Sequence, residues 1–152
     1  MIPMNINKVN RNVVRKGKRG KRVKNVCINL IFGGVNPDGA MSKLTTIKKA
    51  IRETGSGVWT MQETKASRAG KLKFDGFITY EHTRSNQEGG GISLSALEAL
   101  SPAFVRDGGE EVEALTVNIS LKQITILCNT GYGPQESAPV VKKVSFWNYF
   151  EE

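Results

Sequence analysis

The apolar positions in the first half of the chain follow a strand, helix, strand pattern. Residues 26–32 form an apolar run interrupted by one asparagine, which predicts a strand buried on both faces. The glycine-rich stretch 33–39 predicts a loop, and residues 42–54 carry leucine and isoleucine at helical spacing after Ser42, a candidate N-cap. A second buried strand is expected at 58–61. A strand–helix–strand unit of this length favours parallel pairing of its two strands.

The second half of the chain alternates between apolar and polar residues, as antiparallel strands do. Strands are expected at 77–80, 92–95, 112–121 and 124–128, with a hairpin turn joining the last two. Apolar residues then return at helical spacing in 144–152, which predicts a second helix. The whole pattern predicts an α/β fold with one sheet and flanking helices.

Three polar sites share one position in this pattern, because each follows an apolar strand. Asn36 and Asp38 follow the first strand, Glu63 follows the second, and Tyr132 follows the last. Loops at the carboxyl ends of strands gather at one edge of an open sheet, where ligands bind. A carboxylate there suits Mg²⁺, which needs only one or two protein oxygens, and such groups fit phosphodiester hydrolysis. Taken singly, residues 36–39 are more often a turn, and Glu63 is more often a solvated side chain.

Four motifs, in order along the chain, resemble those of the endonuclease/exonuclease/phosphatase superfamily, whose fold is DNase I-like. Residues 59–65 (WTMQETK) resemble its QET-K motif, and residues 36–39 (NPDG) resemble its N-x-D/N-G motif. Residues 89–94 (GGGISL) are similar to its glycine-led central strand, and residues 130–135 (TGYGPQ) to its Y-x-P-N/Q motif. The resemblance is closest to exonuclease III-type abasic-site endonucleases and to the endonuclease domains of non-LTR retrotransposons, a class of mobile element.

The resemblance implies half of a DNase I-like four-layer α/β sandwich in residues 26–152, with metal-dependent DNA endonuclease activity. Glu63 would then bind Mg²⁺ or Mn²⁺, with Asp38 supporting the shell of metal ligands. Asn36 would orient the phosphate or the attacking water, and Tyr132 would contact the scissile phosphate. The superfamily's later Asp-x-Asn and Ser-Asp-His motifs have no counterpart here, so the chain is expected to lack a general base and to cleave DNA poorly alone. A second chain that completes the sandwich is one expected partner.

Positive charge is concentrated at the amino terminus. The net charge is +8, and residues 1–24 hold nine lysines and arginines and no acidic residue, whereas the rest holds 13 basic and 14 acidic side chains. We expect residues 1–25 to form a disordered tail that binds nucleic acid, DNA rather than RNA, or addresses the protein to a nucleus. The candidate nucleic-acid contacts, in the tail and beside the QET motif, are Lys16, Lys18, Arg19, Lys21, Arg22, Lys65 and Arg68.

Two other functions stay open. A non-catalytic nucleic-acid-binding protein would use the tail alone, and a phosphatase acting on small molecules or lipids would share the same motifs. No cysteine or histidine spacing suggests zinc, and the single histidine, His82, is expected to be a surface or packing residue. Cys27 and Cys128 are expected to be reduced in an intracellular protein, and no segment approaches transmembrane length.

Overall fold

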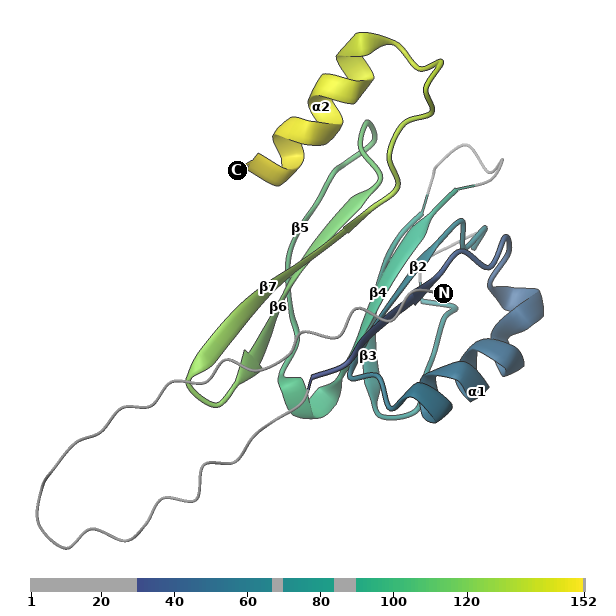
Figure 1. Ribbon diagram of the computed structural model, residues 1–152, viewed down its shortest axis with the longest axis vertical. Coiled ribbons are helices and arrows are strands. Elements are labelled where there is room, and N and C mark those ends of the chain that lie inside the picture. The colour runs from purple at the N-terminus through teal and green to yellow at the C-terminus, as the bar shows by residue number, and fades with distance from the viewer. Residues whose placement is uncertain (1–29, 67–69, 84–89, 152) are drawn as a thin grey trace, which may run out of the picture.

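The computed structural model of the chain describes residues 30–66, 70–83 and 90–151 (Figure 1). The predicted tail therefore lies outside the described residues. The elements, in chain order, are β1 (Phe32–Val35), the 3-10 turn η1 (Met41–Lys43), α1 (Leu44–Thr54), β2 (Val58–Gln62), β3 (Phe77–His82), β4 (Ile92–Leu97), the 3-10 turn η2 (Glu98–Leu100), β5 (Ala103–Asp107), β6 (Ala114–Leu121), β7 (Ile124–Gly131) and α2 (Val140–Glu151). No helix among the described residues is both long and apolar enough to span a membrane.

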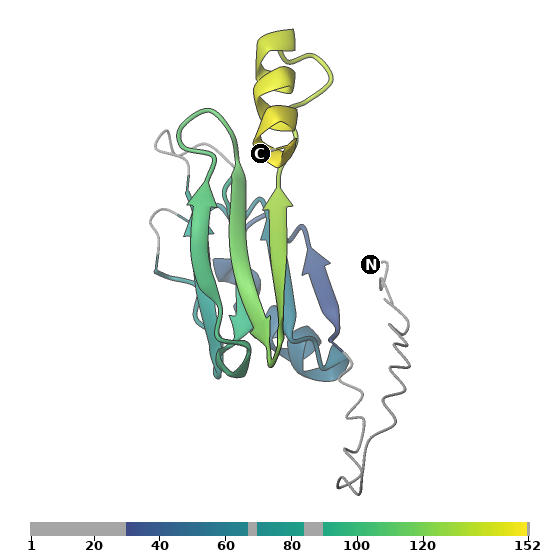
Figure 2. The same ribbon diagram turned by 90° about the vertical axis from the view of Figure 1, so that its left-hand side faces the viewer.

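The strands form two sheets that pack face to face (Figures 1 and 2). One sheet has four strands in the order β1-β2-β4-β3, and the other has three in the order β5-β6-β7. The core between them includes Val58 and Leu94 from the first sheet and Val117 and Ile119 from the second, all with no exposed surface. The α/β class is thus confirmed, but the expected single sheet is two. The alternating strand β6 buries one of its faces, and a second layer is the way to cover it.

The first strand lies later in the chain than its apolar run indicated. β1 passes through Gly33 and Gly34, which the sequence assigned to a loop, and residues 26–29 of the expected strand lie outside the described part. Phe32 pairs with Val58 and Gly33 with Trp59 in parallel register, so the predicted parallel unit is confirmed. A Cβ atom on Gly33 would lie 2.3 Å from the Trp59 ring. Glycine is therefore used here for close approach of the indole to the strand, and not for a turn.

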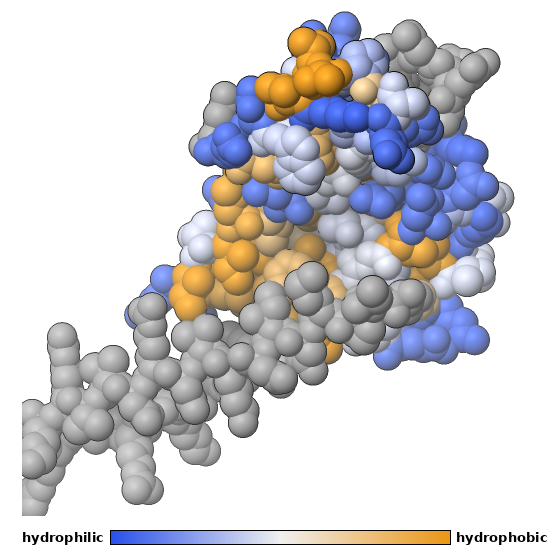
Figure 3. All heavy atoms as spheres, turned by 45° about the horizontal axis from the view of Figure 1, so that its top comes forward, coloured by the Kyte–Doolittle hydropathy of each residue, from blue (hydrophilic) through white to orange (hydrophobic). Residues whose placement is uncertain are grey.

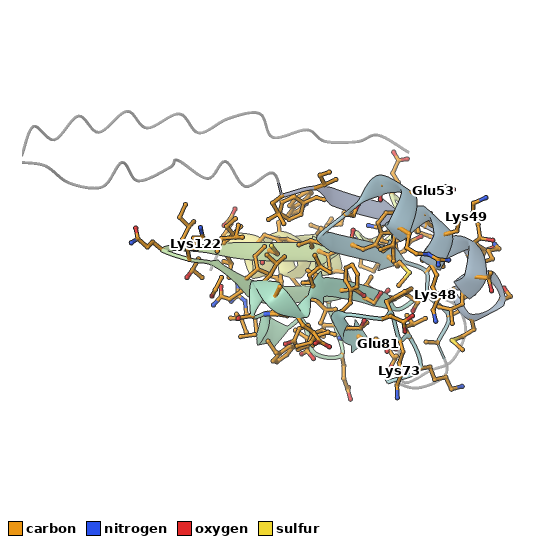
Figure 4. All side chains as sticks on the ribbon, turned by 90° about the horizontal axis from the view of Figure 1, so that it is seen from below. Lys48, Lys49, Glu53, Lys73, Glu81 and Lys122 are labelled. Atoms are coloured by element: carbon orange, nitrogen blue, oxygen red, sulfur yellow. The ribbon has the colours of Figure 1, made fainter. Side chains whose placement is uncertain are left out.

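Helix α1 covers the outer face of the four-stranded sheet. Its buried residues Ile47 and Ile51 pack against Trp59 and Met61 of β2, while Lys49 and Glu53 form an exposed ion pair on its outer side (Figure 4). The expected N-cap is wrong, because the helix begins at Leu44 after a 3-10 turn and the Ser42 hydroxyl donates to the Gly39 carbonyl instead, at 3.2 Å. The helix ends as predicted at Gly55, which is left-handed with φ of 62°.

Helix α2 packs against the outer face of the three-stranded sheet and begins at Val140, four residues before the predicted start. The Tyr149 hydroxyl lies 2.8 Å from the Thr116 hydroxyl, and Arg106 donates to the Tyr149 carbonyl at 2.6 Å. Phe146 is buried beside Tyr149. The opposite side of the helix exposes apolar side chains, and Figure 3 shows apolar surface next to strongly hydrophilic surface on this end of the molecule.

Candidate functional site

Polar side chains from both sheets gather at one end of the sandwich. Strand pairing places Gln62 at the end of β2 opposite Ile92, and Ile92 opposite His82 at the end of β3. In the second sheet, Asp107 at the end of β5 pairs with Leu115 near the start of β6. The ends of β2, β3, β5 and β7 therefore lie together, on the side from which the chain continues into α2 (Figure 1).

The two sheets are joined at this end by a pair of adjacent side-chain contacts. Tyr132, just after β7, donates its hydroxyl hydrogen to Glu63 Oε1 at 2.5 Å. The neighbouring Gln62 donates from Nε2 to the Gly131 carbonyl at 2.7 Å. Two of the four side chains that the sequence expected near the metal, Glu63 and Tyr132, are thus in direct contact although 69 positions separate them.

The backbone around Glu63 is held on two sides. The Gly39 N–H donates to the Glu63 carbonyl at 2.9 Å, and the Thr64 N–H donates to the Gly91 carbonyl at 3.0 Å. Glu63 and Lys65 have φ values of 50° and 48°, in the left-handed region that side-chain-bearing residues rarely adopt. Such strain costs on the order of 1–3 kcal/mol per residue and is concentrated at functional sites. The carboxylate is thereby turned out of the strand's regular alternation and toward the second sheet.

Asn36 and Asp38 lie in a loop beside this contact. The Asn36 side-chain oxygen accepts the Asp38 N–H at 3.2 Å, as in an Asx turn. The Asp38 carboxylate forms an exposed ion pair with Lys65. The hydrogen bond and charge of Lys65 lower the pKa of Asp38, and Asp38 in turn raises the pKa of the Lys65 ammonium. The Asp38 carboxylate is therefore engaged by a lysine, and the Asn36 amide by the backbone of its own turn.

A cleft of about 1210 Å³ opens between the sheets at this end. Glu63 and Tyr132 line it, as do His82 and Asp107, whereas Asn36 and Asp38 do not. Among the described residues, two lysines line the cleft, Lys65 and Lys142. The acidic residues that line it are Glu63, Glu81, Asp107, Glu110, Glu111 and Glu113, but the Glu81 carboxylate accepts the Gly70 and Leu72 N–H groups on the opposite face of β3. Such a lining attracts cations and repels phosphates.

Glu113 is a buried acidic residue at the cleft that joins the two sheets. Its Oε2 accepts the Gly91 N–H at 3.0 Å, and its carbonyl accepts the Tyr132 N–H at 2.8 Å. Because Gly91 also accepts from Thr64, Glu113 braces the backbones that carry both Glu63 and Tyr132. The sequence prediction missed Glu113. The available signal was an acidic residue inside the alternating apolar run 112–121.

The described residues contain no group of three or more histidine, cysteine or acidic side chains arranged to hold a metal ion. A Glu63 carboxylate beside a tyrosine hydroxyl instead fits Mg²⁺, which is usually held by one or two carboxylates together with water and substrate phosphates. Of the expected nucleic-acid contacts, Lys65 lies at the cleft, and Arg68 and the five tail residues lie outside the described residues.

Comparisons with known proteins bear on the fold. No protein-family model matches the chain, and no curated protein does. The crystal structure of AP endonuclease LMAP from Leishmania major is similar, with a TM-score of 0.57 and 15% identity, over 73% of this chain and 41% of that chain. The structure of an AP endonuclease from Archaeoglobus fulgidus has a TM-score of 0.48 and 18% identity, over 69% and 41%. The chain thus spans about two fifths of the Leishmania enzyme and has the fold of part of an AP endonuclease.

Proposed function

We propose that this chain forms a divalent-metal site for phosphodiester hydrolysis of DNA. The observation that carries the proposal is the contact between Glu63 and Tyr132, which brings a carboxylate and a phenol hydroxyl from different sheets together at a cleft. The fold supports DNA as the substrate class, because the similar protein from Leishmania major is named as an AP endonuclease. The motif resemblance of residues 59–65 and 130–135 leads to the same pair of residues.

The residues would divide the work as follows. Glu63 would hold Mg²⁺ or Mn²⁺, which when bound supplies a Lewis acid for a phosphoryl oxygen. Tyr132 would donate a hydrogen bond to the scissile phosphate once that phosphate is bound, and Lys65 would contact the nucleic-acid backbone. Asn36 would orient the phosphate or the attacking water from the adjoining loop, and Asp38 would act on the metal's ligands after its ion pair with Lys65 opens.

The charge of the cleft supports a metal requirement. Apart from Glu81, five acidic residues and two lysines among the described residues line it, so an unassisted phosphodiester would be repelled. A divalent cation at Glu63 offsets this repulsion locally, because the ion is the largest charge in the site. Metal binding and DNA binding at the cleft are therefore expected to depend on one another.

The experiment measures Mn²⁺ affinity and Mg²⁺-dependent cleavage of a duplex with one abasic site. Glu63→Gln keeps the size of the side chain and removes its charge, so it should weaken Mn²⁺ binding and abolish cleavage. Glu53→Gln removes the same charge from the exposed side of α1 and should change neither (Figure 4). Equal Mn²⁺ affinity in the wild type and Glu63→Gln would overturn the proposal. Hydrolysis of a soluble phosphate ester in preference to DNA would instead identify a small-molecule phosphatase.

A second candidate is non-catalytic nucleic-acid binding through the tail. The observation that favours it is the charge distribution, since residues 1–24 hold nine basic residues and the remaining residues are close to neutral. Binding that survives in Glu63→Gln, without metal, but depends on the tail would support this candidate.

A further inference from the structure

We infer that His82, supported by Asp107, accepts the proton of the attacking water in this cleft. The inference rests on the proposed function, because it names the general base of the same reaction. Sequence reasoning expected His82 to be a packing or surface residue and expected the chain to have no general base. The structure instead places this histidine in the cleft together with Glu63 and Tyr132.

The position of His82 follows from strand register. His82 and Gln62 both pair with Ile92, so the three residues form one row across β3, β4 and β2. Residues of such a row point to the same face of a sheet, and neighbouring strands lie roughly 4.8 Å apart. His82 therefore lies about 10 Å from the end of β2 and faces the second sheet, as Gln62 does in contacting Gly131. Glu63 directly follows Gln62, so a phosphodiester bound in the cleft would have Glu63 on one side and His82 on the other.

Asp107 lies beside the imidazole. His82 Nδ1 lies 3.9 Å from Asp107 Oδ2, across the gap between the sheets, and the side chain of His82 is only 11% exposed. The other oxygen of Asp107 accepts the Gly109 N–H at 3.1 Å, which fixes the carboxylate. The separation of 3.9 Å between Nδ1 and Oδ2 is longer than a hydrogen bond, so the proposed role requires that Nδ1–H donate to Asp107 once substrate is bound, which leaves the lone pair on Nε2. Contacts of this kind are often long before substrate binds and shorten in the complex.

The chemistry balances with water as the only co-reactant. The oxygen of a water molecule forms a bond to phosphorus while its proton passes to Nε2 of His82. The bond from phosphorus to the leaving sugar oxygen breaks, and that oxygen takes a proton from solvent. Asp107 stabilises the imidazolium, which returns its proton to solvent before the next turnover.

Other titratable groups of the cleft are less suited to this role. Glu63 accepts from Tyr132, and Glu113 accepts from Gly91. Glu81 points to the opposite face of its strand and accepts backbone N–H groups there. Glu110 and Glu111 are exposed to water, and Lys65 and Lys142 carry positive charge. Histidine is the side chain that most readily exchanges a proton near neutral pH.

The test is single-turnover cleavage of the abasic duplex by the full chain, across pH, in four proteins. His82→Gln should lower the rate by about 10²- to 10³-fold and remove the rise of rate with pH on the acid side. Asp107→Asn should lower the rate in the same direction but less, by roughly 10-fold. His82→Ala should regain part of its rate when imidazole is added, which a merely structural role would not produce. Since the chain has one histidine, the rescue reports on this site alone.

The outcomes separate the inference from the function on which it rests. Mn²⁺ affinity should be unchanged in His82→Gln and reduced in Glu63→Gln. Cleavage by His82→Gln at the wild-type rate with an unchanged pH profile overturns the inference. If cleavage still requires Glu63 in that case, the proposed metal site is retained. Wild-type chain that binds Mn²⁺ through Glu63 but shows no cleavage overturns both the inference and the proposed hydrolysis, and leaves only the metal site.

Discussion

Removing the hydroxyl of Tyr132 leaves the backbone and the charges of the site in place. Tyr132→Phe deletes the hydrogen bond to Glu63 and the proposed donor to the phosphate, so cleavage should fall by roughly 10²-fold. Tyr80→Phe is a matched control, because it also loses one hydroxyl, which donates to the Pro102 carbonyl at 2.9 Å away from the cleft. Single-turnover rates measure both. A loss as large in the control would assign the effect to folding.

Glu81 couples stability to pH. Burial raises the pKa of its carboxyl above the ordinary value of 4.5, although N–H groups of Leu72 and Gly70 favour the charged form. The folded chain then binds this proton more tightly than the unfolded chain. The contribution of this proton to the stability of the folded chain is present below pH 4.5 and is lost as pH rises through the folded pKa of Glu81. Glu81→Gln should gain stability relative to wild type over that interval, as measured by urea unfolding at several pH values, and a constant difference would contradict the assignment.

At the scale of elements, β1 depends on a glycine covered by an indole. Gly33→Ala would place a Cβ atom 2.3 Å from the Trp59 ring, and both backbones are fixed by parallel pairing. We expect a loss of about 1–3 kcal/mol in unfolding free energy, because the indole must leave its rotamer or the strands must separate. Gly133→Ala is the matched control, since its Cβ would lie 3.7 Å from Phe146, an ordinary contact. Denaturant unfolding of both variants checks the difference.

Local pattern predicted most closely the strands whose apolar spacing matches their burial, which are β2 and β6. Strand β1 lies later than its apolar run, and β7 was expected although it exposes Ile124 and Leu127. Strand β5 was not expected, because its side chains are largely exposed and its pairing is interrupted by a bulge between Phe104 and Arg106. The division into two sheets depends on which strand faces pack together. A short stretch of sequence does not contain this information, because the strands that pack are distant in the chain. Glu63 and Tyr132 could be predicted because each follows a strand. Glu113, His82 and Asp107 could not, because only contacts between the two sheets bring them to the cleft.

At the scale of the whole molecule, charge is separated between two parts of the chain. Among the described residues, the charged side chains that line the cleft are mainly acidic, and the excess positive charge of the sequence lies in residues 1–24. A DNA-binding protein built this way would take most of its non-specific affinity from the tail and use the metal to admit one phosphate to the cleft. The two contributions should therefore respond to different conditions, salt for the first and divalent metal for the second.

The salt dependence of duplex binding tests this separation. Each phosphate neutralised by a basic residue adds about 0.9 to the slope of log K against log salt. Replacing four tail residues by glutamine should thus lower the slope by at most about 3.6 and weaken binding at low salt most. The four residues are Lys16, Lys18, Arg19 and Lys21. A control replaces four lysines of the body, labelled in Figure 4, and has the same total charge as the tail variant: Lys48, Lys49, Lys73 and Lys122.

If the tail carries the non-specific affinity, the control should retain nearly the wild-type slope, because its lysines are spread over α1, a loop and the tip of the β6–β7 hairpin. Equal losses in the two variants would mean that net charge alone governs binding and that the tail has no special role. Cleavage measured at saturating DNA should be the same in both variants, since the four body lysines are not among the described residues that line the cleft and the tail is proposed to supply affinity alone. A tail variant that binds DNA weakly but cleaves bound DNA at the normal rate would therefore assign affinity and catalysis to different parts of the chain.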